Sequence, residues 1–196
     1  VYLAAYQLTG REAYATIARE TFDFLDREFR HDEGGFFSTL DARSEGEEGK
    51  YYVWTPDSVE KAIDDERTAD IAKERFGVTE AGNFEGETVL TIDASIPELA
   101  DAYDCDEGEI VERLDDARAA LFEAREERVR PARDEKVLAS WNGLAISSLA
   151  RGGLVLGDES YTELATDALG FVREHLWDGD RERLARRYKG GDVKGE

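Results

Sequence analysis

Apolar residues recur at every third or fourth position in two segments that lie 147 residues apart in the chain. This spacing predicts one helical hairpin over 1–30 and a second over 139–177. Gly10 and Gly157 stand at corresponding positions of the two copies, where each is suited to the left-handed residue that ends a helix. Because one hairpin cannot bury both of its faces by itself, the repeat favours a fold of stacked hairpins.

Between the two hairpins the pattern is less regular and the elements are shorter. Aromatic, β-prone residues at 34–40 and 50–54 flank a glycine-rich acidic loop, which predicts a β-hairpin loop over 34–54. Prolines and capping residues mark the starts of further helices. Helix dominates, so we expect an all-α fold in a single domain over 1–196. The other predicted segments are helices at 56–76 and 96–128, a loop at 130–138 and a terminal loop with a short β-ribbon at 178–196.

Charge narrows the range of partners. The chain has 46 acidic and 25 basic residues and a net charge of -21, and such a surface repels nucleic acid and anionic lipid. The acids are spread over every segment and lysine is scarce, which favours a halophilic surface solvated in a salt-rich cytoplasm. No segment approaches the roughly 20 apolar residues of a membrane span, and no signal peptide is visible in these residues. We therefore expect a cytoplasmic protein without nucleic-acid or membrane partners.

The cysteine and the histidines of the chain do not indicate a redox, metal or catalytic site. A single cysteine, Cys105, excludes an internal disulfide, a CxxC redox centre and a thiolate zinc site. His31 and His175 follow the two repeated helices near carboxylates, so we interpret them as cations that complement helix C-termini. The sequence contains no P-loop, no GxGxxG and no Ser-His-Asp order, and we predict no cofactor.

The loop over 41–49 holds four carboxylates in nine residues. Carboxylates held close together raise each other's pKa and serve as general acids or bases, which makes Asp41 and Glu45 candidate catalytic residues. The same cluster offers oxygen ligands for calcium or magnesium, although its spacing differs from an EF-hand. Exposed acids are also the rule in this chain. A catalytic loop, a metal-binding loop and a solvated loop all stay open.

Aromatic residues gather beside this acidic loop. Alternation along a strand sends about half of the side chains inward, so most of these rings are expected in the core. One or two rings that face a cavity would stack on a sugar. Tyr52 and Trp54 are therefore candidate substrate-binding residues.

A charge-dense segment with a proline runs directly into the apolar helix of the second hairpin. In one interpretation it faces a pocket, in which Asp134 is catalytic while Arg133 and Lys136 bind substrate together with Trp141 and Asn142. In the other, Arg133 and Asp134 pair to hold the segment, Trp141 packs and Asn142 caps the helix. The sequence leaves both interpretations open.

Three stretches in order point to a family: GGFFSTLDARSEGEEGKYYVW at 34–54, GNFEG at 82–86 and RPARDEKVLASWNGL at 130–144. They closely resemble the thioredoxin-domain-containing proteins of the "domain of unknown function 255" family. The resemblance implies an N-terminal thioredoxin-like domain followed by an α/α toroid, similar to six-hairpin glycosidases and N-acylglucosamine 2-epimerases. We therefore expect this chain to be an incomplete (α/α)6 toroid that lacks the thioredoxin-like domain.

Two positions depart from the family pattern. Arg43 stands where the family usually has an acid, and Ala132 stands where histidine is common. Any chemistry that depends on those two positions is therefore missing from this chain.

The resemblance and the aromatic residues together favour a carbohydrate-active or sugar-binding module, glycosidase-like or epimerase-like, with a sugar as its ligand. The first alternative is a non-catalytic interaction module that serves the thioredoxin-like domain. The second is a divalent-metal-binding module built on the acidic loop. Apolar helix faces at the ends of an open ring also predict a homodimer.

Overall fold

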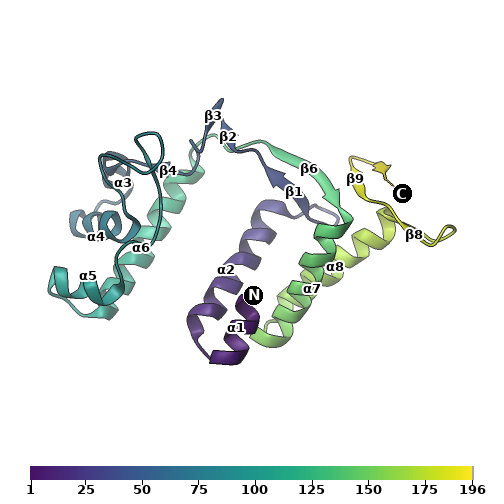
Figure 1. The fold of residues 1–196 in the computed structure, drawn as a ribbon, viewed down its shortest axis with the longest axis horizontal. Helices are drawn as coiled ribbons and strands as arrows, with labels where there is room; N and C mark the ends of the chain where they lie inside the picture. Colours follow the sequence, from purple (N-terminus) through teal and green to yellow (C-terminus); the bar gives the residue numbers. More distant parts are fainter. Residues whose placement is uncertain (196) are drawn as a thin grey trace. The chain divides into compact units, whose positions relative to one another are not determined.

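The computed structural model describes residues 1–195, which form two compact units (Figure 1). Unit 1 joins residues 1–40 to the segment that begins at Arg133, and unit 2 comprises Asp41–Ala132. Helices make up most of the regular structure, as predicted, but the fold is not all-α because it also contains a four-stranded sheet. Within residues 1–195, no helix is both long enough and apolar enough to cross a membrane.

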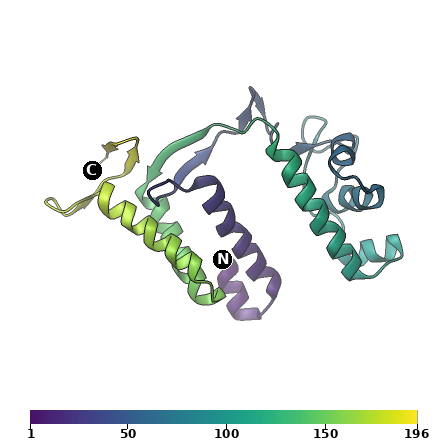
Figure 2. The ribbon, with the colours of Figure 1, turned by 180° about the vertical axis from the view of Figure 1, so that it is seen from behind.

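Unit 1 contains two helical hairpins, which lie side by side in both views (Figures 1 and 2). Gly10 and Gly157 end the first helix of each hairpin with φ values of 67° and 68°, in the left-handed region. The predicted 147-residue repeat is therefore confirmed as a repeat of structure. The four helices are α1 (Tyr2–Thr9), α2 (Glu12–Phe29), α7 (Ala139–Leu156) and α8 (Glu159–His175).

Two adjacent glycines let α7 lie close to its neighbours. A Cβ atom at Gly152 would lie 2.4 Å from the ring of Phe22 in α2, and one at Gly153 would lie 2.1 Å from Thr162 Oγ1 in α8. Phe22 also packs on Tyr161, with ring centroids 4.9 Å apart. The hydrophobic core of unit 1 surrounds these contacts. Its other buried members are Leu3, Ala18, Phe36, Leu149, Leu164, Ala165 and Ala168.

A four-stranded antiparallel sheet with strand order β1-β6-β9-β10 completes unit 1. Phe37 and Tyr188 both lie opposite Val137, so the three side chains share one face of the sheet. This face packs on Phe171 of α8. The strands are β1 (Phe37–Leu40), β6 (Arg133–Leu138), β9 (Arg187–Lys189) and β10 (Asp192–Lys194), and the short pair β7 (Trp177–Asp178) and β8 (Arg183–Leu184) precedes β9.

The sheet corrects two predictions. The segment 130–138, predicted as a loop, contains strand β6, and the predicted strand at 34–40 pairs with β6 instead of with 50–54. In the latter segment, β4 (Val53–Trp54) pairs with β5 (Thr88–Val89). Alternation of side chains identifies a strand but not its partner, and the partner of β1 lies far along the chain.

Unit 2 is built around a long helix, α6, which packs on α3, α4 and α5. Thr55, Ser95 and Asp106 are the N-caps of α3, α5 and α6, since each side chain accepts a hydrogen bond from a backbone N–H in the first turn of its helix. The elements not yet described are α3 (Pro56–Ala62), α4 (Glu66–Phe76), α5 (Ile96–Tyr103), α6 (Glu107–Glu126), β2 (Arg43–Ser44) and β3 (Glu47–Glu48).

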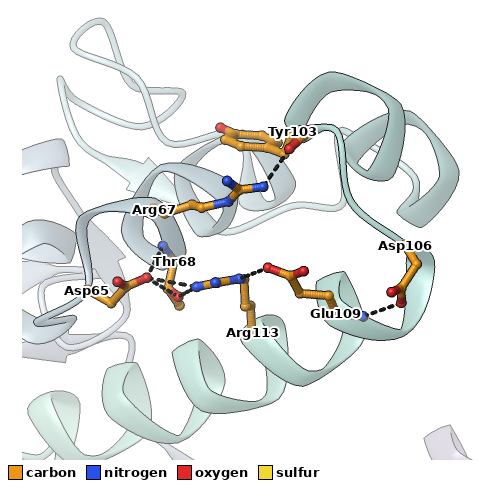
Figure 3. Close-up of polar contacts among 7 residues, drawn as sticks. All are labelled: Asp65, Arg67, Thr68, Tyr103, Asp106, Glu109 and Arg113. Carbon is orange, nitrogen blue, oxygen red and sulfur yellow. Dashed lines mark hydrogen bonds and ion pairs between the residues drawn. The ribbon is translucent and has the colours of Figure 1, made fainter.

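Figure 3 shows the polar contacts that join α4 to α6. Arg113 in α6 donates from Nη1 to Asp65 Oδ1 and Thr68 Oγ1, both at 2.9 Å. Its Nε donates to Glu109 Oε1 at 2.8 Å. Asp65 is also the N-cap of α4, and hydrogen bonds from Thr68, followed by the charge of Arg113, lower the pKa of its carboxyl. The start of α4 is thereby tied to α6.

Arg128 joins the segment after α6 to strand β4. Its Nη1 donates to the carbonyl oxygens of Tyr51 at 3.1 Å and Val53 at 2.7 Å. The guanidinium carbon lies 4.1 Å from the ring centroid of Trp54, which is only 3% exposed. Burial lowers the pKa of this guanidinium, the expected result when a cation leaves water. The contacts hold the aromatic segment against the end of α6.

We predict that Arg128→Gln lowers the free energy of unfolding by about 2–3 kcal/mol, because half-buried carbonyls lose their donor and Trp54 loses its cation. Urea denaturation followed by tryptophan fluorescence measures the change. Lys61→Gln makes the same charge change at an exposed position of unit 2 and should alter the free energy by less than about 0.5 kcal/mol. Equal effects of the two substitutions would contradict the assigned role.

Tyr161 links the two hairpins of unit 1 through a hydrogen bond from its hydroxyl to Asp23 Oδ1 at 3.2 Å. Burial, followed by the nearby Asp23 carboxylate, raises the pKa of Tyr161 to about 12. The folded protein therefore holds this proton more tightly than the unfolded chain, in which a tyrosine has a pKa of about 10.

The stabilisation from Tyr161 should be fully present below about pH 10 and be lost as the pH rises through about 12, with a total of up to about 3 kcal/mol. Urea unfolding at about pH 9 and about pH 11 should show this loss in the wild-type chain. A smaller loss is expected in Tyr161→Phe, which keeps the ring but cannot ionise. An unchanged pH dependence in the variant would refute the prediction.

Candidate functional site

A cavity of about 510 Å³ in unit 1 brings together three of the residues that the sequence predicted for a site, Asp134, Lys136 and Trp141. It is bounded by the sheet, the start of α7 and the residue before β9. Asp134, Lys136 and Trp141 thus lie at one cavity, and whether a ligand binds there stays a prediction. The remaining lining residues are Ser38, Thr39, Leu138, Arg186, Arg187, Lys194 and Gly195.

The alternation of the sheet explains why these side chains meet. Val137 points to the core face, so Asp134, Lys136 and Leu138 belong largely to the opposite face of β6. Thr39 lies opposite Asp134 across the β1–β6 pair, and Arg187 lies opposite Leu138 across the β6–β9 pair. The apolar face of the sheet therefore builds the core, and the polar face becomes a wall of the cavity.

Asp134 is held in its ionised form. Lys136 Nζ lies 2.8 Å from its Oδ2, and Lys189 Nζ lies 3.6 Å from its Oδ1. The hydrogen bond from Lys136 and the charges of both lysines lower the pKa of the Asp134 carboxyl. Asp134 is therefore suited to accept hydrogen bonds or a proton, and unsuited to donate a proton near neutral pH.

Trp141 provides an aromatic surface at the same cavity. It lies in the first turn of α7 and is 50% exposed, whereas the other interpretation expected it to pack. Lys136, with 42% of its side chain exposed, keeps donor capacity beyond its bond to Asp134. An exposed ring beside charged and hydroxyl groups can bind a ligand that has both apolar and polar faces.

Asn142, predicted to bind substrate, is instead part of the core. It is 1% exposed, and its Oδ1 accepts a hydrogen bond from Phe36 N at 2.8 Å. Its Nδ2 donates to Phe36 O at 2.9 Å and to Leu138 O at 3.0 Å. Both donors of the carboxamide are used by backbone carbonyls, so Asn142 positions the cavity wall and does not reach a ligand.

We predict that Asn142→Leu, which keeps the volume but removes these bonds, lowers the free energy of unfolding by about 2–4 kcal/mol. The cause is that backbone groups of Phe36 and Leu138 would stay unpaired inside the protein. Chemical denaturation measures the change. Ser140→Ala, an exposed position on the same helix, is the control and should have an effect of less than about 0.5 kcal/mol. A mild effect of Asn142→Leu would show that the pairing is dispensable.

Arg133, also predicted to bind substrate, lies beside the cavity and is not one of the residues that line it. Its guanidinium carbon lies 4.2 Å from the ring centroid of Phe37, and its Nη1 donates to Glu28 O at 3.2 Å. Its carboxylate neighbour is Glu135 at 3.7 Å, so the predicted pair with Asp134 is wrong. Arg133 holds β1 and β6 to the end of α2.

The other predicted site residues, Asp41, Glu45, Tyr52 and Trp54, belong to unit 2. Trp54 is buried under Arg128 and is unavailable for stacking on a ligand. Asp41 accepts a hydrogen bond from Arg43 N at 2.9 Å, a local turn contact. Tyr52 packs edge-on against the neighbouring Tyr51, with ring centroids 4.9 Å apart.

Lys50 partly neutralises the negative charge of the acidic loop at 41–49. Lys50 Nζ lies 3.3 Å from Glu45 Oε2 and 2.8 Å from Glu47 Oε1. Among residues 1–195, no three histidine, cysteine or acidic side chains are placed to hold a metal ion. The divalent-metal alternative therefore gains no geometric support from the described part of the chain.

Sequence reasoning missed Arg186, Arg187 and Lys194, which line the cavity. A signal for them does exist, because the segment 181–194 has six basic residues and only two acidic ones in a chain that is otherwise strongly acidic. A local reversal of charge of this kind could have marked the segment as part of a site.

Comparison with known proteins places the chain among longer relatives. Spermatogenesis-associated protein 20 from Homo sapiens is 34% identical over 209 residues, which cover 94% of this chain and 27% of that protein. The Mus musculus protein of the same name is 32% identical over 210 residues, covering 95% of this chain and 27% of the relative. An uncharacterized protein from Caenorhabditis elegans is 24% identical over 189 residues, covering 85% of this chain and 26% of the relative.

No protein-family model matches the chain. The chain spans about a quarter of the length of the curated relatives that it matches. Over nearly all of its own length, however, it is similar to spermatogenesis-associated protein 20.

Proposed function

We propose that unit 1 binds a sugar in the cavity lined by Asp134, Lys136 and Trp141. The observation that supports this proposal is the half-exposed ring of Trp141 beside an ionised carboxylate and the hydroxyl of Thr39 in one cavity. Sugars present apolar C–H faces, which stack on aromatic rings, and hydroxyls, which bond to charged and polar side chains. In this proposal Asp134 accepts from ligand hydroxyls, and Lys136 donates to them.

The composition of the cavity favours binding over cleavage of a glycosidic bond by unit 1 alone. Glycoside hydrolysis uses two carboxyl groups, one of which must carry a proton to donate. Asp134 is the only carboxylate among the described lining residues, and Lys136 keeps it ionised.

We also propose that the two hairpins of unit 1 belong to an (α/α)6 toroid, in a member of the family that joins such a toroid to a thioredoxin-like domain. The 147-residue structural repeat supports the first part of this proposal. The similarity to spermatogenesis-associated protein 20 supports membership of the family. The alternative for the module as a whole is a docking role for the thioredoxin-like domain, with no sugar ligand.

Isothermal titration calorimetry of the chain against a panel of neutral and charged monosaccharides tests sugar binding. At least one sugar should bind, and Trp141→Ala should weaken its affinity by about tenfold, the equivalent of about 1.4 kcal/mol of lost stacking. Trp177→Ala is a matched control, because Trp177 is also half-exposed in unit 1, at 47%, but lines a different cavity.

Two outcomes would overturn sugar binding at this site. One is the absence of binding across the panel, which would favour the docking alternative. The other is an equal loss of affinity in Trp141→Ala and Trp177→Ala, which would place the sugar elsewhere or show a general effect on folding.

A further inference from the structure

We infer that the cavity contains an anion subsite, formed by Arg186, Arg187 and Lys194, which selects sugars that carry an anionic oxygen group. The sugar part of this inference rests on the proposed function above, whereas the anion part rests on the charges described below. The relevant ligand chemistry is a phosphate ester or a carboxylate attached to a monosaccharide.

The cavity has the opposite charge balance to the chain as a whole. The chain carries a net charge of -21, yet among residues 1–195 the charged residues that line the cavity are four cations and a single carboxylate, Asp134. A group of cations attracts small anions to the place where it lies, whereas the acidic surface elsewhere on the chain repels them. The four cations are Lys136, Arg186, Arg187 and Lys194.

Nearby carboxylates only partly neutralise these cations. Lys136 and Lys189 share Asp134. Arg187 and Lys194 share Asp192, at 3.4 Å and 3.2 Å. Arg186 pairs with no carboxylate of residues 1–195, so its planar guanidinium keeps its donors for a ligand such as phosphate or carboxylate.

The β9–β10 hairpin sets two of the cations against each other. Arg187 and Lys194 are direct cross-strand partners, so their side chains leave the same face of the hairpin, where both contact the carboxylate of Asp192. The turn that joins the strands has Gly190 and Gly191 at φ values of 53° and 87°. Two consecutive positive φ values are typical of the tight turns that fix the register of a hairpin. The cation pair is therefore built into the backbone.

The backbone also fixes the place of Arg186. Its N–H donates to Gly195 O at 2.7 Å, and its carbonyl accepts from Ala139 N at 3.0 Å, at the start of α7. Trp141 lies two residues further along α7 and lines the same cavity. The anion-binding donors and the aromatic surface thus bound one space, as a ligand with a ring and a charged substituent requires.

The test compares four probes by calorimetry on the chain at about 0.1 M ionic strength, where charges are only partly screened. The probes are glucose, glucose 6-phosphate, glucuronate and inorganic phosphate. At least one charged sugar should bind about tenfold or more tightly than glucose, and its affinity should fall as salt is raised to about 1 M. The stronger of the two charged sugars identifies phosphate or carboxylate as the selected group.

Arg186→Gln should lower the affinity for the charged sugar by about tenfold and so remove most of its preference over glucose. Arg173→Gln, an exposed position on α8 outside the cavity lining, makes the same charge change and should leave every affinity unchanged. If Arg186→Gln loses its fold, as judged by circular dichroism, Lys194→Gln replaces it with the same expected result.

The outcomes separate the two proposals. Equal affinities for glucose and the charged sugars would overturn the anion subsite and leave sugar binding intact. Binding of inorganic phosphate that depends on Arg186, without binding of any sugar, would support the anion subsite and overturn the sugar function. A preference for charged sugars that survives both Arg186→Gln and Lys194→Gln would overturn the assignment of the subsite to these residues.

Discussion

The buried carboxamide of Asn142 is the interaction on which the rest of unit 1 depends. It pairs with both backbone groups of Phe36, which precedes β1, and with the carbonyl of Leu138, which ends β6. One side chain thereby joins the first hairpin, the sheet and α7. Successive residues of a helix point about 100° apart, so a helix that turns Asn142 inward directs Trp141 away from that core position. The aromatic surface of the cavity is a consequence of the buried contact.

The sheet likewise has one face in the core and one face at the cavity. Val137 is fully buried against Phe171, while its neighbours Lys136 and Leu138 reach the cavity. A strand with one apolar and one charged face places ionic groups next to each other without burying them, and this avoids the large desolvation penalty of buried charges. Asp134 can consequently remain ionised and partly exposed between two lysines.

The sequence was most informative where the physics is local. Gly10 and Gly157 marked the ends of helices because a left-handed residue favours glycine, and capping residues marked the starts of helices because their side chains bond within one turn. The pairing of β1 with β6 was missed, because it depends on residues distant in the chain. Asn142 was misassigned for a related reason. A carboxamide forms hydrogen bonds with backbone groups and with ligands equally well. Only the burial of the side chain shows which of these two partners Asn142 has.

The net charge of the whole chain did not indicate that the cavity is lined mainly by cations. A net charge of -21 argues against nucleic acid as a partner, but it describes the whole surface and not a cavity. The cations of 181–194 were dispersed in sequence among glycines and aliphatic residues, and the antiparallel pairing of β9 and β10 brought Arg187 opposite Lys194. Strand pairing thus converts a modest local excess of basic residues into a concentrated field. The acidic surface of the rest of the chain repels anions, so anion binding in the proposed subsite depends on the cations that this strand pairing brings together.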